Sequence, residues 1–336
     1  MPKTYKTAVV GATGAVGLEM IKMLENRNFP VESIKLLASS KSAGKKLKFK
    51  GKDITVETLT KDSGKGIDIA LYSAGATVSK EFAPHFAADG CFVIDNSSAW
   101  RMDKNIPLVV PEVNPQALSK DKKIIANPNC STIQMVVALK PLHDEAKIKR
   151  VIVSTYQSVS GAGQKGINEL TNQAKAWAKG EKIPQNSTFQ AQIAFNVIPH
   201  IDVFTDNGYT KEEMKMTNET KKIMGDESIE VSAACIRVPV FRSHSENVWI
   251  ETQKPLPPKR AIELLSAADG IKVIDLPKYP LPLEAQNEQI VYVGRVRQDI
   301  SKPDGNALTF WVVSDNLLKG AALNAVEIAE ELIKII

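Results

Sequence analysis

The sequence has only three cysteines, Cys91, Cys130 and Cys235, among its 336 residues. Three thiols make no disulfide framework, which predicts reduced cysteines and a cytoplasmic protein. No apolar run reaches the roughly 20 residues that a membrane-spanning helix needs. Lys3 and Lys6 lead straight into an apolar strand, so we expect no secretory signal and no membrane partner.

The sequence also lacks a strong excess of positive or negative charge. The 43 basic and 38 acidic residues leave a net charge of +5, and the densest basic stretch, Lys41 to Lys52, holds six lysines. That stretch predicts a solvated loop and is too short to indicate a nucleic-acid partner. We also predict no metal site. A hydrophobic fraction of 43% and a charged fraction of 24% are ordinary for a globular protein, and the length predicts two domains.

The first part of the chain alternates short apolar strands with helical or loop segments. The expected strands are Thr7–Val10, Ile34–Ala38, Ile67–Ser73, Phe92–Asp95, Leu108–Val110 and Ile124–Ala126. Such alternation is typical of a parallel sheet covered by helices. It predicts an α/β domain over residues 1–127.

The pattern changes from Val151 on. The strands expected there are Val151–Tyr156, Val231–Val238, Val248–Thr252, Ile290–Arg297 and Ala307–Val313, with helical stretches near 164–180, 210–224 and 258–268. This mixture predicts an α+β domain with a large sheet over residues 128–316. The chain ends in an amphipathic helix over 317–336, which we expect to return to the first domain.

A glycine-rich turn joins the first expected strand to a helix from about Leu18 to Asn26. It reads Gly11-Ala12-Thr13-Gly14-Ala15-Val16-Gly17, which is G-x-x-G-x-x-G rather than the commoner G-x-G-x-x-G. Between a strand and a helix, such a motif predicts a Rossmann-like dinucleotide site, although a purely structural turn is the alternative. The predicted cofactor contacts here are Gly11, Thr13, Gly14, Ala15 and Val16.

The loop after the second strand bears on the choice of cofactor. NAD-specific sites usually place a carboxylate there for the ribose 2′-hydroxyl. The loop Ser39-Ser40-Lys41-Ser42 has no carboxylate, but three hydroxyls and a lysine. We therefore expect Ser39, Lys41 and Ser42 to bind a 2′-phosphate, which favours NADP, and a polar surface loop is the alternative.

A lone thiol, Cys130, stands in the polar sequence Asn127-Pro128-Asn129-Cys130-Ser131-Thr132, directly before an apolar run from Ile133 to Leu142. The run predicts a buried helix that begins at or near Cys130. Unpaired N–H groups and the helix dipole favour a thiolate there, and a thiolate is a ready nucleophile. The alternative is a small buried residue beside a turn.

His244 is one of only four histidines and lies in a polar break between two expected strands. Cysteine with a histidine that moves protons is a standard pair for covalent acyl chemistry. Arg237 precedes it by seven residues at the end of an apolar strand, where a guanidinium suits bidentate binding of a carboxylate. A structural imidazole and a structural ion pair are the respective alternatives.

Several motifs occur in the order found in one family. They are Gly11–Gly17, Asn129–Thr132, Gln157 with Ser160–Gly163, Glu219 with Lys222, Arg237 with His244, and Asp315–Ala321. Over nearly its whole length the chain resembles the bacterial aspartate-semialdehyde dehydrogenases. The resemblance implies a glyceraldehyde-3-phosphate dehydrogenase-like architecture and a homodimer built through the second domain.

The resemblance also implies a reaction. L-4-aspartyl phosphate would be reduced with NADPH to L-aspartate 4-semialdehyde and phosphate, in the biosynthesis of lysine, methionine and threonine. Cys130 would attack the acyl phosphate, expel phosphate and form a thioester. The thioester would accept a hydride, and the resulting thiohemiacetal would collapse to the aldehyde.

Roles for single residues follow from the same resemblance. His244 is the implied acid/base and Gln157 orients the intermediate. Arg237 is implied to hold the α-carboxylate and Glu219 the α-ammonium. The other implied contacts are Arg101 and Lys222 to phosphate, and Ser160, Gly161 and Asn316 to the cofactor. Taken alone, Glu219 and Lys222 are also typical of a surface i,i+3 pair.

Two other functions stay open. A reductase of N-acetyl-glutamyl phosphate shares this architecture and a Cys–His pair, but its substrate has a blocked amine and no use for Glu219 as an ammonium ligand. A non-enzymatic NADP sensor is the second alternative, and the intact Cys130, Gln157 and His244 argue against it.

Overall fold

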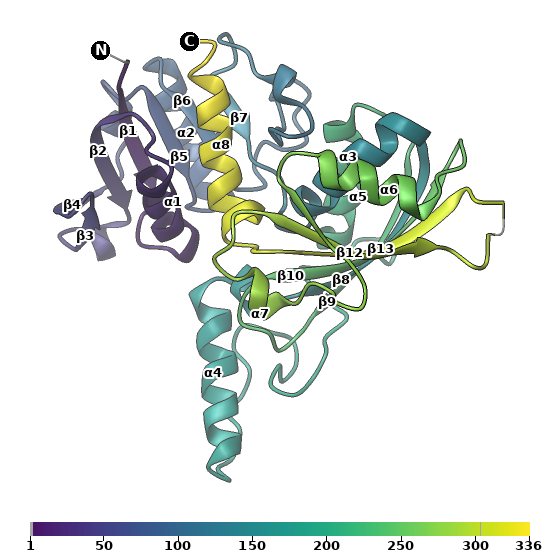
Figure 1. Ribbon diagram of the computed structural model, residues 1–336. Coiled ribbons are helices and arrows are strands. Elements are labelled where there is room, and N and C mark those ends of the chain that lie inside the picture. The colour runs from purple at the N-terminus through teal and green to yellow at the C-terminus, as the bar shows by residue number, and fades with distance from the viewer. Residues whose placement is uncertain (1–2, 303) are drawn as a thin grey trace. The chain divides into compact units, whose positions relative to one another are not determined.

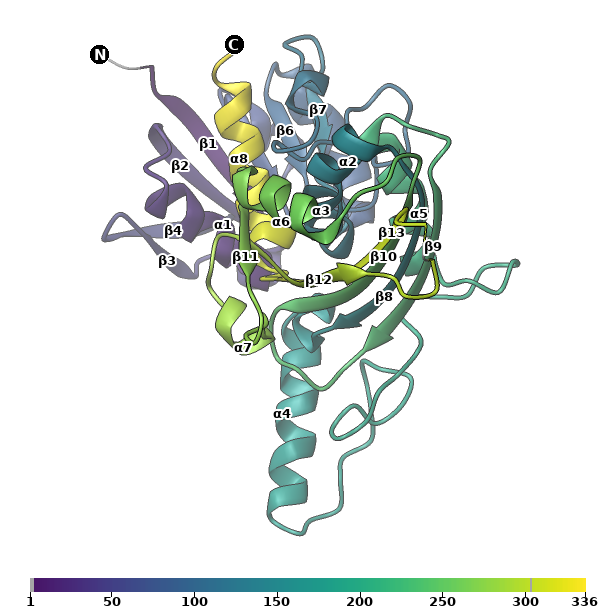
Figure 2. The same cartoon turned by 45° about the vertical axis from the view of Figure 1, so that its right-hand side comes forward.

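The computed structural model describes residues 3–302 and 304–336, and the chain divides into two compact units. Unit 1 comprises Met1–Asn129 and Ala321–Ile336, and unit 2 comprises Cys130–Gly320. The boundaries expected from the sequence were 127/128 and 316/317. Each unit is built around its own sheet (Figures 1 and 2).

Unit 1 contains a seven-stranded sheet in the order β3-β4-β2-β1-β5-β6-β7. Its strands are β1 (Tyr5–Val10), β2 (Val31–Ala38), β3 (Lys46–Phe49), β4 (Lys52–Thr58), β5 (Ile69–Tyr72), β6 (Phe92–Asp95) and β7 (Ile124–Ala126). Only β3 and β4 pair in antiparallel fashion; the other neighbours are parallel. The α/β domain with a mainly parallel sheet is thus confirmed.

Two local predictions in unit 1 were wrong. The lysine-rich segment expected to be a loop contains β3, in which exposed lysines alternate with Leu47 and Phe49. That period of two buries one face of a strand and leaves the other in water. The expected strand Leu108–Val110 makes only a single bridge, from Leu108 to Ala126. Pro107 and Pro111 flank it, and proline cannot donate to a ladder.

The helices of unit 1 are α1 (Ala15–Asn26), α2 (Ala76–Ala88) and α8 (Leu323–Leu332). A π-helical turn, Leu318–Ala322, precedes α8, so the last α-helix is shorter than expected. α8 packs beside α1, and Arg27 donates two hydrogen bonds to Glu330, at 2.7 Å from Nε and 2.6 Å from Nη2. The return of the C-terminal helix to the first domain is therefore confirmed (Figure 1).

Unit 2 contains a six-stranded mixed sheet in the order β11-β12-β13-β10-β8-β9. The strands are β8 (Ile148–Gln157), β9 (Glu230–Arg237), β10 (His244–Thr252), β11 (Ile271–Ile274), β12 (Val291–Gln298) and β13 (Ala307–Ser314). The helices are α3 (Cys130–Ala146), α4 (Gln164–Ala178), α5 (Lys211–Met224), α6 (Pro258–Ala267) and α7 (Pro282–Ala285). Figure 1 shows α3, α5 and α6 on one side of this sheet and α4 on the other.

The strand register brings three strand ends together. β8 and β9 run parallel, with Gln157 next to Arg237 as the last pair. β10 runs antiparallel to β8 and pairs Ser245 with Tyr156, so its first residue, His244, falls beside Gln157. The three side chains predicted to be functional therefore lie at one end of the sheet.

No helix among the described residues has both the length and the apolar character needed to cross a membrane.

Candidate active site

The glycine turn of unit 1 has the geometry of an anion-binding loop. Gly11 has a φ of +81°, and a Cβ on it would lie 2.3 Å from the carbonyl oxygen of Ser73. A Cβ on Gly17 would lie 2.2 Å from the carbonyl oxygen of Gly11. α1 begins directly after Gly14 and has no acidic residue in its first turn. Its first N–H groups and its dipole therefore suit a pyrophosphate.

A cavity of about 490 Å³ adjoins this turn. Polar residues of the glycine turn and of the loop after β2 line it, and an apolar wall comes from Leu59, Val78 and Phe82. The lining from the two loops consists of Gly11, Thr13, Gly14, Ser39 and Ser40. Thr13 Oγ1 also donates to Ser42 Oγ at 3.3 Å, which ties the two loops together. These residues fit a dinucleotide, with phosphates at the turn and a base against the apolar wall.

Arg101, also in unit 1, is a buried residue and not the solvated one that a polar loop suggests. Its Nε donates to the carbonyl oxygen of Asn127 at 3.0 Å, and its Nη2 donates to that of Asn96 at 2.9 Å. The two carbonyls fix the orientation of the guanidinium. A cation held in this way suits an anion such as phosphate.

Cys130 is the first residue of α3, as the sequence predicted. The side chain is partly exposed, whereas Ser131 to Leu139 are all buried, and the first turn of α3 has no acidic residue. Gly320 packs against it so closely that a Cβ there would lie 2.9 Å from Cys130 Cβ. The thiol thus stands at the positive end of a helix dipole in a constrained position, which favours its thiolate form.

Arg237 is a buried guanidinium without a carboxylate ion pair among the described residues. Its Nη1 donates to the carbonyl oxygen of Ser158 at 2.7 Å, and the Phe189 ring lies 5.7 Å from its Cζ. Burial lowers the pKa of Arg237, and the nearby Glu212 and Cys130 act in the opposite direction. A buried cation of this kind is stabilised by an anion that enters the site.

His244 is the first residue of β10 and fully buried, and not in a polar break as expected. Its Nδ1 accepts a hydrogen bond from the backbone N–H of Ser158 at 3.0 Å. Burial, and then the charge of Arg237, lower the pKa of His244 to about 3. The imidazole is therefore neutral near pH 7.

Gln157 connects this group to a carboxylate that the sequence alone did not reveal. Its Nε2 donates to Glu212 Oε1 at 3.2 Å. Lys215 Nζ donates to Glu212 Oε2 at 3.2 Å and to Asp202 Oδ2 at 2.8 Å. Burial lowers the pKa of Lys215, but the two carboxylates outweigh burial and raise it overall. Gln157 thus contacts a buried carboxylate whose other oxygen pairs with the Lys215 ammonium.

Glu219 and Lys222, the pair expected in this place, lie farther along α5. Seven residues separate Glu219 from Glu212, which is about 10.5 Å at the rise of an α-helix. Glu212 and Lys215 repeat the Glu–x–x–Lys spacing of Glu219 and Lys222 one heptad earlier. That repeat was the one signal in the sequence that indicated Glu212 and Lys215.

The predicted cofactor contacts of unit 2 form a polar cluster next to His244. Asn316 Oδ1 accepts from Ser160 Oγ at 3.0 Å and from the backbone N–H of Ser243 at 2.9 Å. A Cβ on Gly161 would lie 2.8 Å from Arg237 Nη1 and 3.3 Å from His244 Nε2. Only a glycine leaves room beside these two side chains.

Across the described part of the chain, no group of three or more His, Cys, Asp or Glu could hold a metal ion.

Two family profiles match the chain. The NAD-binding domain of semialdehyde dehydrogenases matches residues 6–121, and the dimerisation domain of the same enzymes matches residues 139–319. Together they account for both units.

Curated and structural relatives agree with these profiles. Aspartate-semialdehyde dehydrogenases of Aquifex aeolicus and Bacillus subtilis are 59% and 50% identical, over at least 98% of either chain in each pair. The aspartate semialdehyde dehydrogenase II of Vibrio cholerae, solved with ASA, is 49% identical with a TM-score of 0.96, and 99% of both chains are covered. The chain therefore belongs to the aspartate-semialdehyde dehydrogenase family.

Proposed function

We propose that this protein reduces L-4-aspartyl phosphate to L-aspartate 4-semialdehyde and phosphate, as a cytoplasmic enzyme of the aspartate pathway. The observation that carries the proposal is a thiol at the start of α3 in the same unit as a buried Arg237 and a buried Glu212. A substrate with a carboxylate, an ammonium and an acyl phosphate needs these three groups.

The substrate's α-carboxylate pairs with Arg237, whose guanidinium can donate two parallel hydrogen bonds. Its α-ammonium pairs with Glu212, which takes the role that the resemblance gave to Glu219. Lys215 stands beside Glu212 and takes the phosphate role given to Lys222, with Arg101 of unit 1 as the second predicted phosphate ligand. Ser160, Gly161 and Asn316 keep their predicted role toward the cofactor.

In the reaction the Cys130 thiolate forms a C–S bond to the acyl carbon, and the C–O bond to phosphate breaks. A nicotinamide dinucleotide, when bound, would supply the hydride that reduces the resulting thioester. The C–S bond then breaks, which releases the aldehyde and restores the thiolate. Gln157, whose amide donates to Glu212 and to Thr155 Oγ1, is fixed in position and orients the intermediate.

Activity on two aldehydes tests this proposal. Aspartate semialdehyde should support phosphate-dependent reduction of NADP, because its free ammonium can pair with Glu212. N-acetyl-glutamate semialdehyde should react at least about 10²-fold more slowly, since its blocked amine cannot form an ion pair with Glu212, at a cost of about 3 kcal/mol. Steady-state kinetics at saturating phosphate gives both rates. A preference for the acetylated aldehyde would establish the alternative reductase instead.

NADP is the proposed dinucleotide. A solved relative from Candida albicans, 28% identical with a TM-score of 0.76, contains NADP. In this chain the cavity beside the glycine turn is lined by Ser39 and Ser40, and the lysine of the same loop, Lys41, is exposed. Hydroxyls and a cation suit a 2′-phosphate, and no carboxylate of this loop repels it.

The variant Ser39→Asp should selectively weaken the use of NADP. The new carboxylate repels the 2′-phosphate, and because Ser39 is exposed, solvent screening holds the penalty to about 1–2 kcal/mol, or about five- to thirtyfold in kcat/KM. Activity with NAD should change little, and the NADP penalty should shrink at high salt. Kinetics with both cofactors at two salt concentrations provides the check. An equal loss with NAD would show that the loop does not face the 2′ position.

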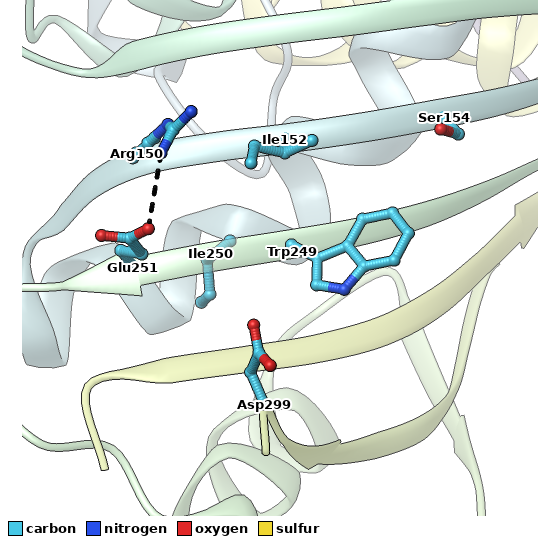
Figure 3. Close-up of a pocket in the computed structure, with 7 residues that line it drawn as sticks. All are labelled: Arg150, Ile152, Ser154, Trp249, Ile250, Glu251 and Asp299. Carbon is cyan, nitrogen blue, oxygen red and sulfur yellow. Dashed lines mark ion pairs between the residues drawn. The ribbon is translucent and has the colours of Figure 1, made fainter. Parts of the chain in front are cut away.

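A homodimer through unit 2 belongs to the same proposal. The face of the sheet opposite α3 carries exposed Ile152 and Tyr156. Figure 3 shows a pocket of about 390 Å³ on this sheet, where Ile152 and Trp249 lie near an Arg150–Glu251 ion pair of 3.7 Å. A sheet face with exposed apolar and aromatic side chains among charged ones suits burial against a second copy, in line with the dimerisation profile that matches this unit.

A further inference from the structure

The two carbonyl groups that orient Arg101 lie just beyond the ends of neighbouring strands of unit 1. Asn96 follows β6 directly and Asn127 follows β7 directly, and these strands run parallel. The N–H of Asn127 donates to the carbonyl oxygen of Asp95 at 2.8 Å, and that of Asn96 donates to the carbonyl oxygen of Tyr72 at 2.9 Å. The carbonyl oxygens of Asn96 and Asn127 accept from Arg101. The position of the guanidinium therefore depends on where these two asparagines are held.

The side chains of the two asparagines tie the strand ends to each other. Asn127 is fully buried, and its Nδ2 donates to Asn96 Oδ1 at 2.6 Å. A shift of either residue would break this bond, and a buried amide without a partner is costly. The bond thus fixes the spacing of the two carbonyls that face Arg101.

The C-terminal segment of the chain supplies further partners of the Asn127 amide. Asn127 Nδ2 also donates to the carbonyl oxygen of Ala321 at 3.0 Å, and its Oδ1 accepts from Asn324 Nδ2 at 2.6 Å. Asn324 lies in the first turn of α8, is fully buried and also donates to the carbonyl oxygen of Val109 at 3.1 Å. A peptide carbonyl can only accept, so Ala321 and Val109 fix which way the two amides point. The C-terminal segment therefore holds Asn127 through both its nitrogen and its oxygen.

Attachment of α8 alone gives no reason for an asparagine in this place. Val326 and Ile328 of the same helix are fully buried, and Arg27 donates two hydrogen bonds to Glu330. An apolar side chain at position 324 would attach the helix without the cost of burying an amide. The amide of Asn324 is explained by the two oxygens to which it donates.

We propose that Asn324 is a positioning residue for phosphate binding: through Asn127, it fixes the carbonyls that orient the guanidinium of Arg101. A guanidinium that is slightly misplaced makes poorer hydrogen bonds to an anion, because such bonds require a defined direction. Arg101 contacts phosphate, and Asn324 acts only through it. The proposal rests on the function proposed above, in which Arg101 is a phosphate ligand.

The variant Asn324→Leu removes the donor and keeps a side chain of similar volume. Asn127 Oδ1 then loses its partner on α8, so the carbonyls that hold Arg101 should lose their fixed position. The KM for phosphate should rise at least about fivefold, whereas kcat at saturating phosphate and the KM values for aspartate semialdehyde and NADP should stay within about twofold. Steady-state kinetics of phosphate-dependent NADP reduction measures all four parameters. An unchanged KM for phosphate would overturn the proposal.

The variant Asn324→Ala also lacks the donor and gives the same measurement if leucine does not fit. Alanine adds no atom that could clash, and it suits a helix. Phosphorus-31 NMR titration of phosphate into the NADP-loaded protein gives its Kd without turnover, and each variant should bind phosphate more weakly than the parent. A parent-like Kd in a folded variant would contradict the role of Asn324.

Val326→Ala is the matched control for a general loss of stability. Val326 lies about 200° around α8 from Asn324 and is equally buried. Its replacement should lower the midpoint of thermal unfolding and leave the KM for phosphate within about twofold of the parent. If Val326→Ala raises this KM as much as Asn324→Leu does, the effect comes from stability and not from positioning, and the proposal fails.

The variant Arg101→Lys tests whether Asn324 acts through Arg101. Lysine keeps the charge but lacks the planar group that donates to both carbonyls. Arg101→Lys should raise the KM for phosphate by itself, and Asn324→Leu should then add less than about twofold in its presence. Effects that multiply would place the action of Asn324 elsewhere and overturn the proposal. A parent-like KM in Arg101→Lys would instead refute Arg101 as a phosphate ligand, so a failure of the proposed function is distinguishable from a failure of the role of Asn324.

Discussion

Replacement of Cys130 by alanine is expected to abolish turnover and to leave cofactor binding nearly intact. The thiol provides the only sulfur at the start of α3, and the proposed reaction requires a C–S bond to the acyl carbon. Removal of a covalent nucleophile should lower kcat by at least about 10⁴-fold. The glycine turn and its cavity belong to unit 1, so the dinucleotide should still bind with nearly the same Kd.

The other two cysteines cannot replace Cys130. Cys91 and Cys235 are buried, and burial raises the pKa of each thiol, so neither provides a thiolate at neutral pH. Cys91→Ala is the matched control: it removes a core thiol from unit 1 and should reduce stability slightly while kcat stays within a few-fold. Rapid-quench detection of a labelled acyl-enzyme, together with titration of the dinucleotide, measures both properties. Turnover of Cys130→Ala within about tenfold of the parent would exclude covalent catalysis by this residue.

The sequence sufficed for features that depend on neighbours along the chain. The apolar run after Cys130 predicted α3 and its first residue, because a helix start is a local pattern of polar cap and apolar face. The glycine turn likewise predicted its own geometry, since Gly11 occupies a positive φ that other residues rarely adopt. The parallel sheet of unit 1 followed from the alternation of apolar strands.

What the sequence could not show depends on contacts between distant residues. Ser158 and His244 are 86 positions apart, and Ser158 and Asn316 are 158 apart, so no local pattern indicates their hydrogen bonds. The choice between Glu219 and Glu212 is a different case: α5 repeats the same Glu–x–x–Lys spacing one heptad apart, so the sequence pattern fits both pairs.

A matched pair of variants decides which carboxylate of α5 receives the substrate's ammonium. Glu212→Gln removes the charge that lies beside Gln157 and opposes the pKa effects of burial on Arg237 and His244. Loss of one partner from a buried charge pair costs about 2–5 kcal/mol, so kcat/KM for the amino acid substrate should fall by about 30- to several-thousand-fold. Glu219→Gln makes the same chemical change about two helical turns away and should affect thermal stability more than kcat/KM.

The kcat/KM values of the parent and of both variants are also measured with a substrate analogue that lacks the amine. If Glu212 binds the ammonium, the parent should lose activity on this analogue, and Glu212→Gln should discriminate far less between analogue and substrate. Such coupling is a property of an ion pair, and a merely structural role for Glu212 would lower both activities alike. Thermal unfolding of each variant separates loss of fold from loss of recognition. If the discrimination is lost in Glu219→Gln and kept in Glu212→Gln, the ammonium site lies two turns farther along α5, where the family resemblance first placed it.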